Sequence, residues 1–287
     1  MNPAHFILQS HRGAGDLSTD NTIEAFELGW SLGTIPEADV RTTSDGVIVA
    51  FHDGNFSRVV NGAGPDLAKR KVPETSWEEL SRFDVGSWKG PQFSSHRVPR
   101  TADIFDRMRG RPERQLYLDI KDVNLRQLAR EVEAAGVGPQ VLLASTDYRI
   151  IREWIAMIPD GRTLLWMGTR GVEDEEILQE RFGELRAAGF QAISQLQIHV
   201  FQKLAPECIR RETPDPFFPS DEFLIQTGRE LERHGILFQA LPWGGATEAV
   251  YWKLLDLGVR SFATDHPDVT LEALRNYKAM NTPRQST

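Results

Sequence analysis

Short apolar runs recur at regular intervals along the chain, and each is rich in Val, Ile, Leu or Phe. Runs of this length and composition are typical of strands that are buried on both faces of a parallel sheet. The predicted strands are residues 6–9, 38–41, 115–120, 140–144, 163–167, 192–197, 236–241 and 260–263.

Amphipathic stretches separate these runs and predict helices at residues 21–32, 102–109, 125–135, 149–158, 173–188, 221–234, 247–257 and 269–280. Asn21, with Glu24 three residues later, predicts a capping box, so we expect Asn21 to cap the first helix rather than to act as a ligand. Eight alternating strand–helix pairs predict a closed (β/α)8 TIM barrel, because each crossover must be right-handed and each strand needs cover on both faces. An open doubly wound sheet is the structural alternative, although no glycine-rich dinucleotide-binding turn follows the first run.

Two intervals interrupt the alternation. Residues 54–100 hold many Gly and Pro residues around a short helical stretch at 77–83, which predicts a small insertion after the second strand. Residues 205–219, with four prolines, predict a second long loop after the sixth strand. We expect both segments to border the active site of one barrel domain that covers residues 1–280 and is followed by a tail at 281–287.

Composition narrows the possible partners. The formal net charge is -8, and Lys and Arg are scattered singly, which argues against a nucleic-acid partner. No apolar run approaches the roughly 20 residues of a membrane helix, and residues 1–5 lack the features of a signal peptide, so we expect a cytoplasmic protein without integral membrane association. Cys208 is the only cysteine, so any metal must be bound by oxygen or nitrogen.

Acidic side chains gather on the second and third predicted strands. Glu37 and Asp39 are two residues apart and therefore point to the same side of a strand, as do Asp119 and Lys121. At one rim of a barrel these three carboxylates would converge, at a cost of roughly 4 kcal/mol for each like-charged pair about 4 Å apart. A divalent cation would remove this repulsion, and ligation by oxygen alone favours Mg²⁺ or Ca²⁺.

Basic and aromatic residues stand close to these carboxylates in the predicted barrel. His11 and His52 flank the acidic cluster in sequence, and two imidazoles can serve as general base and general acid near neutral pH. Arg12 and Lys121 supply the positive charge that a phosphate needs. Trp243 would either pack in the core or form an apolar wall beside the substrate. Together these residues predict a site for a phosphodiester.

Several motifs, in order from the first strand to the last, resemble those of the glycerophosphodiester phosphodiesterase family. They are His11-Arg12-Gly13, Asp20-Asn21-Thr22, Glu37-x-Asp39, Thr43-x-Asp45-Gly46, His52-Asp53, Asp119-x-Lys121 and Thr264-Asp265-x-Pro267.

This resemblance implies a metal on the three carboxylates, His11 and His52 as acid and base, and phosphate contacts from Arg12 and Lys121. It also implies a small-molecule glycerophosphodiester substrate that is hydrolysed to glycerol 3-phosphate and an alcohol. In this family a glycerol hydroxyl commonly attacks its own phosphorus, and water then opens the cyclic phosphate.

The chain departs from the family pattern at three places. Asp20 and Asp119 stand where the family more often has Glu, which shortens each carboxylate by one methylene group. Trp243-Gly244-Gly245-Ala246 replaces the usual Trp-Thr-Val-Asn, so we expect this chain to lack one polar contact near the substrate.

Two alternative functions use the same residues. The first is a phospholipase D-type hydrolase of lysophospholipids or sphingolipids, which an apolar rim around residues 86–93 or 206–219 would favour. The second is a non-catalytic barrel that binds a phosphorylated ligand, and the presence of both histidines argues against it.

Overall fold

The computed structural model describes residues 6–168, 175–245 and 247–281 of the chain. Four features predicted from the sequence therefore lie wholly or partly outside the described residues. They are the opening residues 1–5, the start of the predicted helix at 173–174, Ala246, and positions 282–287 of the predicted tail.

All of the strands predicted for the barrel are present, with ends shifted by a few residues. They are β1 (Ile7–Ser10), β2 (Ile35–Thr42), β4 (Leu116–Ile120), β5 (Val141–Ser145), β6 (Arg162–Met167), β7 (Gln195–Gln202), β9 (Leu237–Trp243) and β10 (Ser261–Thr264). The largest shift is at β7, which was predicted at 192–197. Phe190 and Ala192 have φ angles of 52° and 63°, so the chain is still turning at the predicted start of this strand.

Hydrogen bonding orders these strands into a (β/α)8 TIM barrel, as predicted. The order is β1-β10-β9-β7-β6-β5-β4-β2, and β1 also pairs in parallel with β2 through Gln9 and Ile35, so that the strand order closes on itself. Two further strands run antiparallel to barrel strands: β3 (Ile48–Ala50) pairs with β2, and β8 (Phe217–Phe218) pairs with β7.

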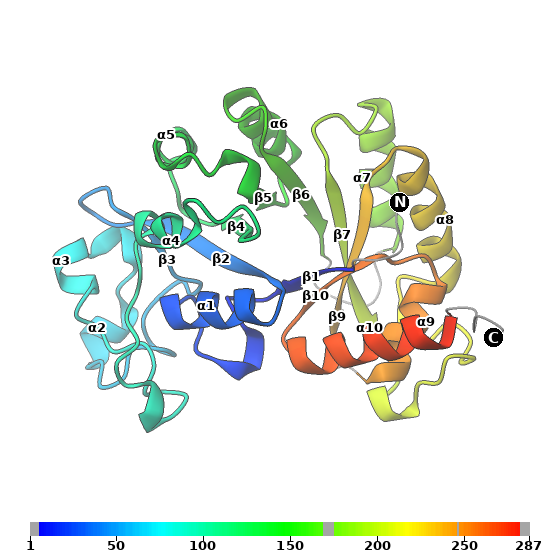
Figure 1. Cartoon of the computed structure of the whole chain (residues 1–287), viewed down its shortest axis with the longest axis horizontal. Coiled ribbons are helices and arrows are strands. Elements are labelled where there is room, and N and C mark those ends of the chain that lie inside the picture. The colour runs from blue at the N-terminus through cyan, green and yellow to red at the C-terminus, as the bar shows by residue number, and fades with distance from the viewer. Residues whose placement is uncertain (1–5, 169–174, 246, 282–287) are drawn as a thin grey trace. The chain divides into compact units, whose positions relative to one another are not determined.

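Helices alternate with the strands along the chain (Figure 1). They are α1 (Ile23–Ser31), α4 (Thr101–Met108), α5 (Leu125–Ala135), α6 (Tyr148–Met157), α7 (Glu175–Ala187), α8 (Asp221–Arg233), α9 (Glu248–Asp256) and α10 (Pro267–Asn281). Asn281 therefore ends a helix and does not begin the tail.

The predicted capping box at the start of α1 is wrong. Thr22 is the N-cap residue, and its side chain accepts a hydrogen bond of 3.3 Å from the backbone N–H of Ala25. Asn21 has a left-handed φ of 54° and lies before the cap, where its side chain is available for another contact.

The chain divides into two compact units, Gln9–Leu164 and Leu165–Thr287 with Met1–Leu8. The first unit contains β2 to β5 and every predicted site residue except Trp243, which belongs to the second unit. The boundaries that we predicted for one barrel domain at 1–280 stay a prediction.

The predicted insertion lies in the first unit and has its own small core. It contains α2 (Pro65–Lys69), α3 (Trp77–Leu80) and the short 3₁₀ helices η2 (Val72–Glu74) and η3 (Pro91–Phe93). Its buried side chains pack with those of β3 and the residue after it: Val49, Phe51, Phe56, Val59, Val60, Val72, Leu80, Val85 and Val98. This packing fixes the chain between residues 51 and 60, which carries His52.

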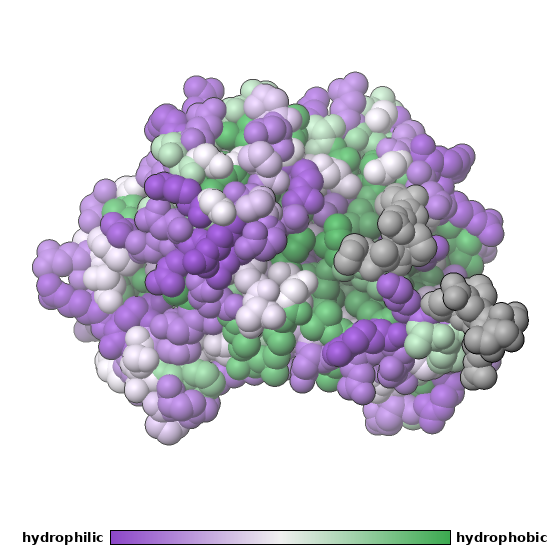
Figure 2. All heavy atoms as spheres, in the orientation of Figure 1, coloured by the Kyte–Doolittle hydropathy of each residue, from purple (hydrophilic) through white to green (hydrophobic). Residues whose placement is uncertain are grey.

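Hydrophilic side chains dominate the region of Figure 2 that α2 and α3 occupy in Figure 1. Among the described residues, the exposed large hydrophobic side chains are Leu17, Ile177, Leu204, Val269 and Met280. No helix in the described part of the chain combines the length and the apolar character needed to cross a bilayer.

Candidate active site

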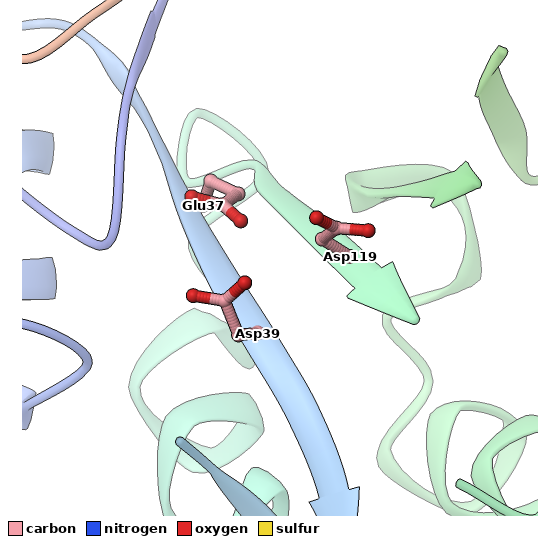
Figure 3. Close-up of side chains that lie close together, drawn as sticks. All are labelled: Glu37, Asp39 and Asp119. Atoms are coloured by element: carbon pink, nitrogen blue, oxygen red, sulfur yellow. The ribbon is translucent and has the colours of Figure 1, made fainter. Parts of the chain in front are cut away.

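The three predicted metal ligands lie side by side in the first unit. Parallel pairing of β2 with β4 sets Asp39 opposite Asp119, and Glu37 lies two residues earlier on the same face of β2. Each of the three offers a carboxylate oxygen, and these oxygens all lie within 4.8 Å of one another. Figure 3 shows the three side chains pointing toward one another from the two strands.

Burial makes this arrangement electrostatically unfavourable without a cation. Glu37 and Asp39 are buried. Burial, and next the charge of Asp39, raise the pKa of Glu37 to about 8. Burial also acts to raise the pKa of Asp39, but the charge of Lys121 and the hydrogen bond from Asn21 act in the opposite direction, and this pKa lies below its usual value. A proton on Glu37 or a bound cation would therefore relieve the same repulsion.

Lys121 neutralises part of the acidic charge directly. Its Nζ lies 2.8 Å from Oδ2 of Asp119 and 3.2 Å from Oδ1 of Asp39. Burial would lower the pKa of Lys121, but the charges of Asp119 and Asp39 outweigh burial and raise it. Lys121 is thus held against two of the predicted metal ligands.

One buried oxygen of Asp39 supports a cation site. Oδ1 of Asp39 makes no hydrogen bond, because the approach of Lys121 at 3.2 Å lacks hydrogen-bond geometry. A buried carboxylate oxygen without a donor is costly, and it fits a position that a hard cation would occupy. The three carboxylates present therefore fit Mg²⁺ or Ca²⁺.

Asn21, which we expected to be a helix cap, instead holds the other oxygen of Asp39. Its Nδ2 donates to Asp39 Oδ2 over 2.8 Å, and its Oδ1 accepts from the backbone N–H of Asp39 over 2.9 Å. The left-handed backbone of Asn21 makes this double contact possible. Its place in the Asp20-Asn21-Thr22 motif is the signal that could have revealed the contact.

The loop after β1 brings His11 and Arg12 to the carboxylates. The backbone N–H of Arg12 donates to Glu37 Oε2 over 2.7 Å, and Nε2 of His11 lies 4.0 Å from the same oxygen. Gly13 allows the tight turn, because its φ is 110° and an added Cβ would lie 2.6 Å from the Cβ of Ala25. The local backbone therefore directs both residues toward Glu37.

The guanidinium of Arg12 connects His52 to this loop. Its Nη1 donates to Asp20 Oδ2 over 3.0 Å, and its Nη2 lies 2.9 Å from His52 Nε2. Arginine is always protonated and can only donate, so His52 Nε2 must accept. The imidazole proton is then on Nδ1, which lies 2.8 Å from Asp53 Oδ1. These contacts select one neutral tautomer of His52.

Two further residues at this site, Arg41 and Arg58, were not singled out from the sequence, and Asp53 was noted there only as part of the His52-Asp53 motif. Arg41 donates from Nη2 to the carbonyl oxygen of His52 over 2.7 Å and from Nε to that of Phe51 over 3.1 Å. Arg58 of the insertion contacts Asp53 and Asp20. Isolated arginines in an irregular segment carry no periodic signal, so only their three-dimensional contacts reveal them.

Trp243 lies at the end of β9 in the second unit. Its ring packs edge-on against His199 with a centroid distance of 5.7 Å, and His199 stacks on Trp166 at 4.8 Å. His199 is thus the centre of an aromatic cluster. The substrate contact predicted for Trp243 stays a prediction.

Comparison with known proteins gives a consistent result. The model of the glycerophosphoryl diester phosphodiesterase family matches residues 11–147, a range that includes all the site residues of the first unit named above. A glycerophosphodiester phosphodiesterase of Caldanaerobacter subterraneus is 33% identical over 101 residues, which are 35% of this chain and 39% of that protein. The matched region thus spans well under half of the length of this relative.

Two other proteins match along most of their length. Lysophospholipase D GDPD1 of Homo sapiens is 24% identical over 94% of this chain and 86% of its own. A phosphodiesterase of Oleispira antarctica, solved in complex with the product sn-glycerol-3-phosphate, superposes with a TM-score of 0.65 at 22% identity and covers 94% of this chain and 96% of its own. At 22% identity, this structural match shows a shared fold and nothing further.

Proposed function

Because the chain belongs to the glycerophosphoryl diester phosphodiesterase family, we propose that it hydrolyses glycerophosphodiesters to glycerol 3-phosphate and an alcohol. The observation that carries this proposal is the group of three convergent carboxylates beside two histidines, one of which has an accepting nitrogen. The glycerol 3-phosphate in the related phosphodiesterase is called the product of that enzyme and supports the same substrate class.

Glu37, Asp39 and Asp119 are the proposed ligands of Mg²⁺ or Ca²⁺. When bound, such an ion would supply Lewis-acid polarisation of a phosphoryl oxygen and would offset the negative charge of the site. Oδ1 of Asp39, which makes no hydrogen bond, and the lack of any nitrogen or sulfur ligand in this group support a hard cation. Asn21 keeps the Asp39 carboxylate in place from the opposite oxygen.

We assign the two histidines to the two proton transfers. When Arg12 turns to the bound phosphate, His52 Nε2 accepts the proton of a glycerol hydroxyl, whose oxygen attacks phosphorus, while His11 donates a proton to the oxygen of the departing alcohol. The resulting cyclic phosphate is opened by water, with the two histidines in exchanged roles. Arg12 lies between these groups and offers positive charge to the phosphate.

The surface favours a water-soluble diester over a lipid. Among the described residues, none of the exposed large hydrophobic side chains lies in 86–93 or 206–219, where an apolar rim would indicate lipid binding. The similarity to a lysophospholipase D makes lysophospholipid hydrolysis the alternative to be tested.

An assay of the purified chain on two substrates tests the proposal. We expect it to release glycerol 3-phosphate from glycerophosphocholine in the presence of Mg²⁺ or Ca²⁺, with less turnover of lysophosphatidylcholine. Preference for lysophosphatidylcholine would establish the lipid alternative. Tight binding of glycerol 3-phosphate without turnover of either diester, with either metal, would indicate the non-catalytic barrel.

A further inference from the structure

We propose that Arg58, in the insertion, is a positioning residue that holds His52 in its proton-accepting state through Asp53 and Asp20. This inference rests on the proposed function, since it gives a role in catalysis to His52. It gives a part in catalysis to the insertion, which lies outside the alternating strands and helices. The side chain that acts there, Arg58, pairs with Asp53 and Asp20 and not with the proposed metal ligands.

A closed ring of hydrogen bonds carries the inference. Arg58 donates from Nε to Asp53 Oδ2 over 2.7 Å and from Nη2 to Asp53 Oδ1 over 3.0 Å. Its Nη2 also donates to Asp20 Oδ2 over 2.7 Å. Asp20 accepts from Arg12, Arg12 donates to His52, and His52 donates to Asp53. Asp53 also accepts from Arg58, and this bond closes the ring.

The ring is selective for one tautomer because its two arginines can only donate. Asp53 accepts a hydrogen bond from Nδ1–H of His52 on an oxygen that Arg58 also contacts, and Arg12 requires an acceptor at Nε2. Without Arg58, Asp53 would lose a two-oxygen partner, and Asp20 would keep Arg12 alone. Both carboxylates could then move, and Arg12 could turn toward Asp20 and away from His52.

Charge in the ring supports the same role. Burial acts to raise the pKa of Asp53, but hydrogen bonds from His52 and Arg58 outweigh it and place this pKa far below its usual value. Asp53 is therefore an anion over the whole neutral range and a constant acceptor for His52. The two arginines balance the negative charges of Asp20 and Asp53.

The insertion holds Arg58 in place. Phe56 and Val59, on either side of it in sequence, are buried in the insertion core, and Phe56 packs edge-on against Phe51 with a centroid distance of 5.4 Å. The guanidinium of Arg58 also lies 5.0 Å from the ring centre of Trp88. The core of the insertion thus holds the Arg58 side chain at the site.

The test compares Arg58→Ala and Arg58→Lys with Arg70→Ala as a matched control. Arg70 is in the same insertion, makes a similar two-oxygen ion pair with Glu79, and has a side-chain exposure of 35% against 39% for Arg58. The ¹⁵N chemical shifts of the His52 ring in the full chain report which nitrogen carries the proton, and a His52→Gln variant assigns the signal.

We expect wild type and Arg70→Ala to show the Nδ1–H tautomer, and Arg58→Ala to show a mixture of tautomers. Turnover should fall about 10- to 100-fold in Arg58→Ala with a smaller change in KM, as for other residues that orient a catalytic group. Arg58→Lys should restore only part of the loss, because an ammonium cannot make the forked contact to Asp53 and reach Asp20 as well. Asp53→Asn should add little when combined with Arg58→Ala.

An unchanged Nδ1–H tautomer in folded Arg58→Ala would overturn the inference, as would equal losses of turnover in Arg58→Ala and Arg70→Ala. Thermal denaturation of each variant separates loss of folded protein from loss of positioning. The ring-nitrogen shifts need no substrate, so they test the inference even if the wild-type chain hydrolyses no glycerophosphodiester, a result that would instead remove the proposed function.

Discussion

The candidate site has two halves, the three carboxylates and the ring of hydrogen bonds around His52, and their charges are arranged in opposite ways. The carboxylates of Glu37, Asp39 and Asp119 come from strands, lie within 4.8 Å of one another and leave one buried oxygen without a hydrogen bond. The ring around His52 comes from loops and the insertion, and in it two arginines and a histidine match two carboxylates. The first half thus gathers like charges, whereas in the second each carboxylate pairs with an arginine.

This difference indicates what each half requires. A rigid pair of strands can hold like charges together, because the backbone ladder prevents them from separating, and the excess charge then creates affinity for a cation. Loops have no such restraint, so the groups of the ring must hold one another through paired hydrogen bonds. We therefore expect activity to depend on metal through the three carboxylates. Through the ring of hydrogen bonds around His52, we expect it to depend on side-chain geometry.

The largest expected effect comes from removing the cation or a ligand to it. Chelation with EDTA should abolish turnover, and Asp39→Asn should lower it by about 10³-fold or more, since a metal supplies several kcal/mol of transition-state stabilisation. Calorimetric titration with Mg²⁺ and Ca²⁺ should show weakened binding in Asp39→Asn. The control is Asp103→Asn, an acidic residue that pairs with Arg100 away from the site. Full activity in EDTA would show that the acidic half is not a metal site.

The histidines should come next. His11→Ala and His52→Ala should each lower turnover by about 10²-fold or more while the fold persists. A diester with p-nitrophenol as the departing alcohol needs little protonation of that oxygen, so it should recover much of the activity of His11→Ala but little of that of His52→Ala. Steady-state kinetics on both substrates check this, and recovery in His52→Ala alone would exchange the two assignments.

Asn21→Ala should have a smaller effect that couples stability to metal affinity. It leaves the backbone N–H and one oxygen of Asp39 without partners, which costs about 1–3 kcal/mol of unfolding free energy. Metal affinity should fall about 10- to 100-fold, because the residue orients a ligand. Asn124→Ala, which removes the N-cap of α5, is the matched control: it should lower stability and leave the metal affinity unchanged.

The smallest expected effect is at Thr22, the residue that caps α1. Thr22→Ala should lower the unfolding free energy by about 1 kcal/mol, whereas Thr22→Ser keeps the capping oxygen and should be close to wild type. Urea denaturation measures both. If Thr22→Ala lowered metal affinity as strongly as Asn21→Ala, the separation of helix capping from support of Asp39 would be wrong.

The acidic residues could be predicted from the sequence because they obey a simple periodicity. Glu37 and Asp39 must share a face of any strand, and alternation of apolar runs with amphipathic stretches was enough to predict a parallel barrel. The structure confirms that fold, and the register of β2 with β4 sets Asp39 opposite Asp119. The strand at 192–197 was misplaced, because hydropathy does not show the left-handed turns at Phe190 and Ala192.

The role of Asn21 and the ring through Arg58 could not be predicted in this way. An Asn before an amphipathic stretch is typical of a helix cap, and only the backbone conformation of Asn21 turns its amide toward Asp39. Arg58 and Asp20 are 38 residues apart and meet because the core of the insertion fixes the chain around Phe56 and Val59. Periodicity along one strand determined where acidic groups would gather, whereas contacts between irregular segments depend on packing over long sequence separations, which only the tertiary structure decides.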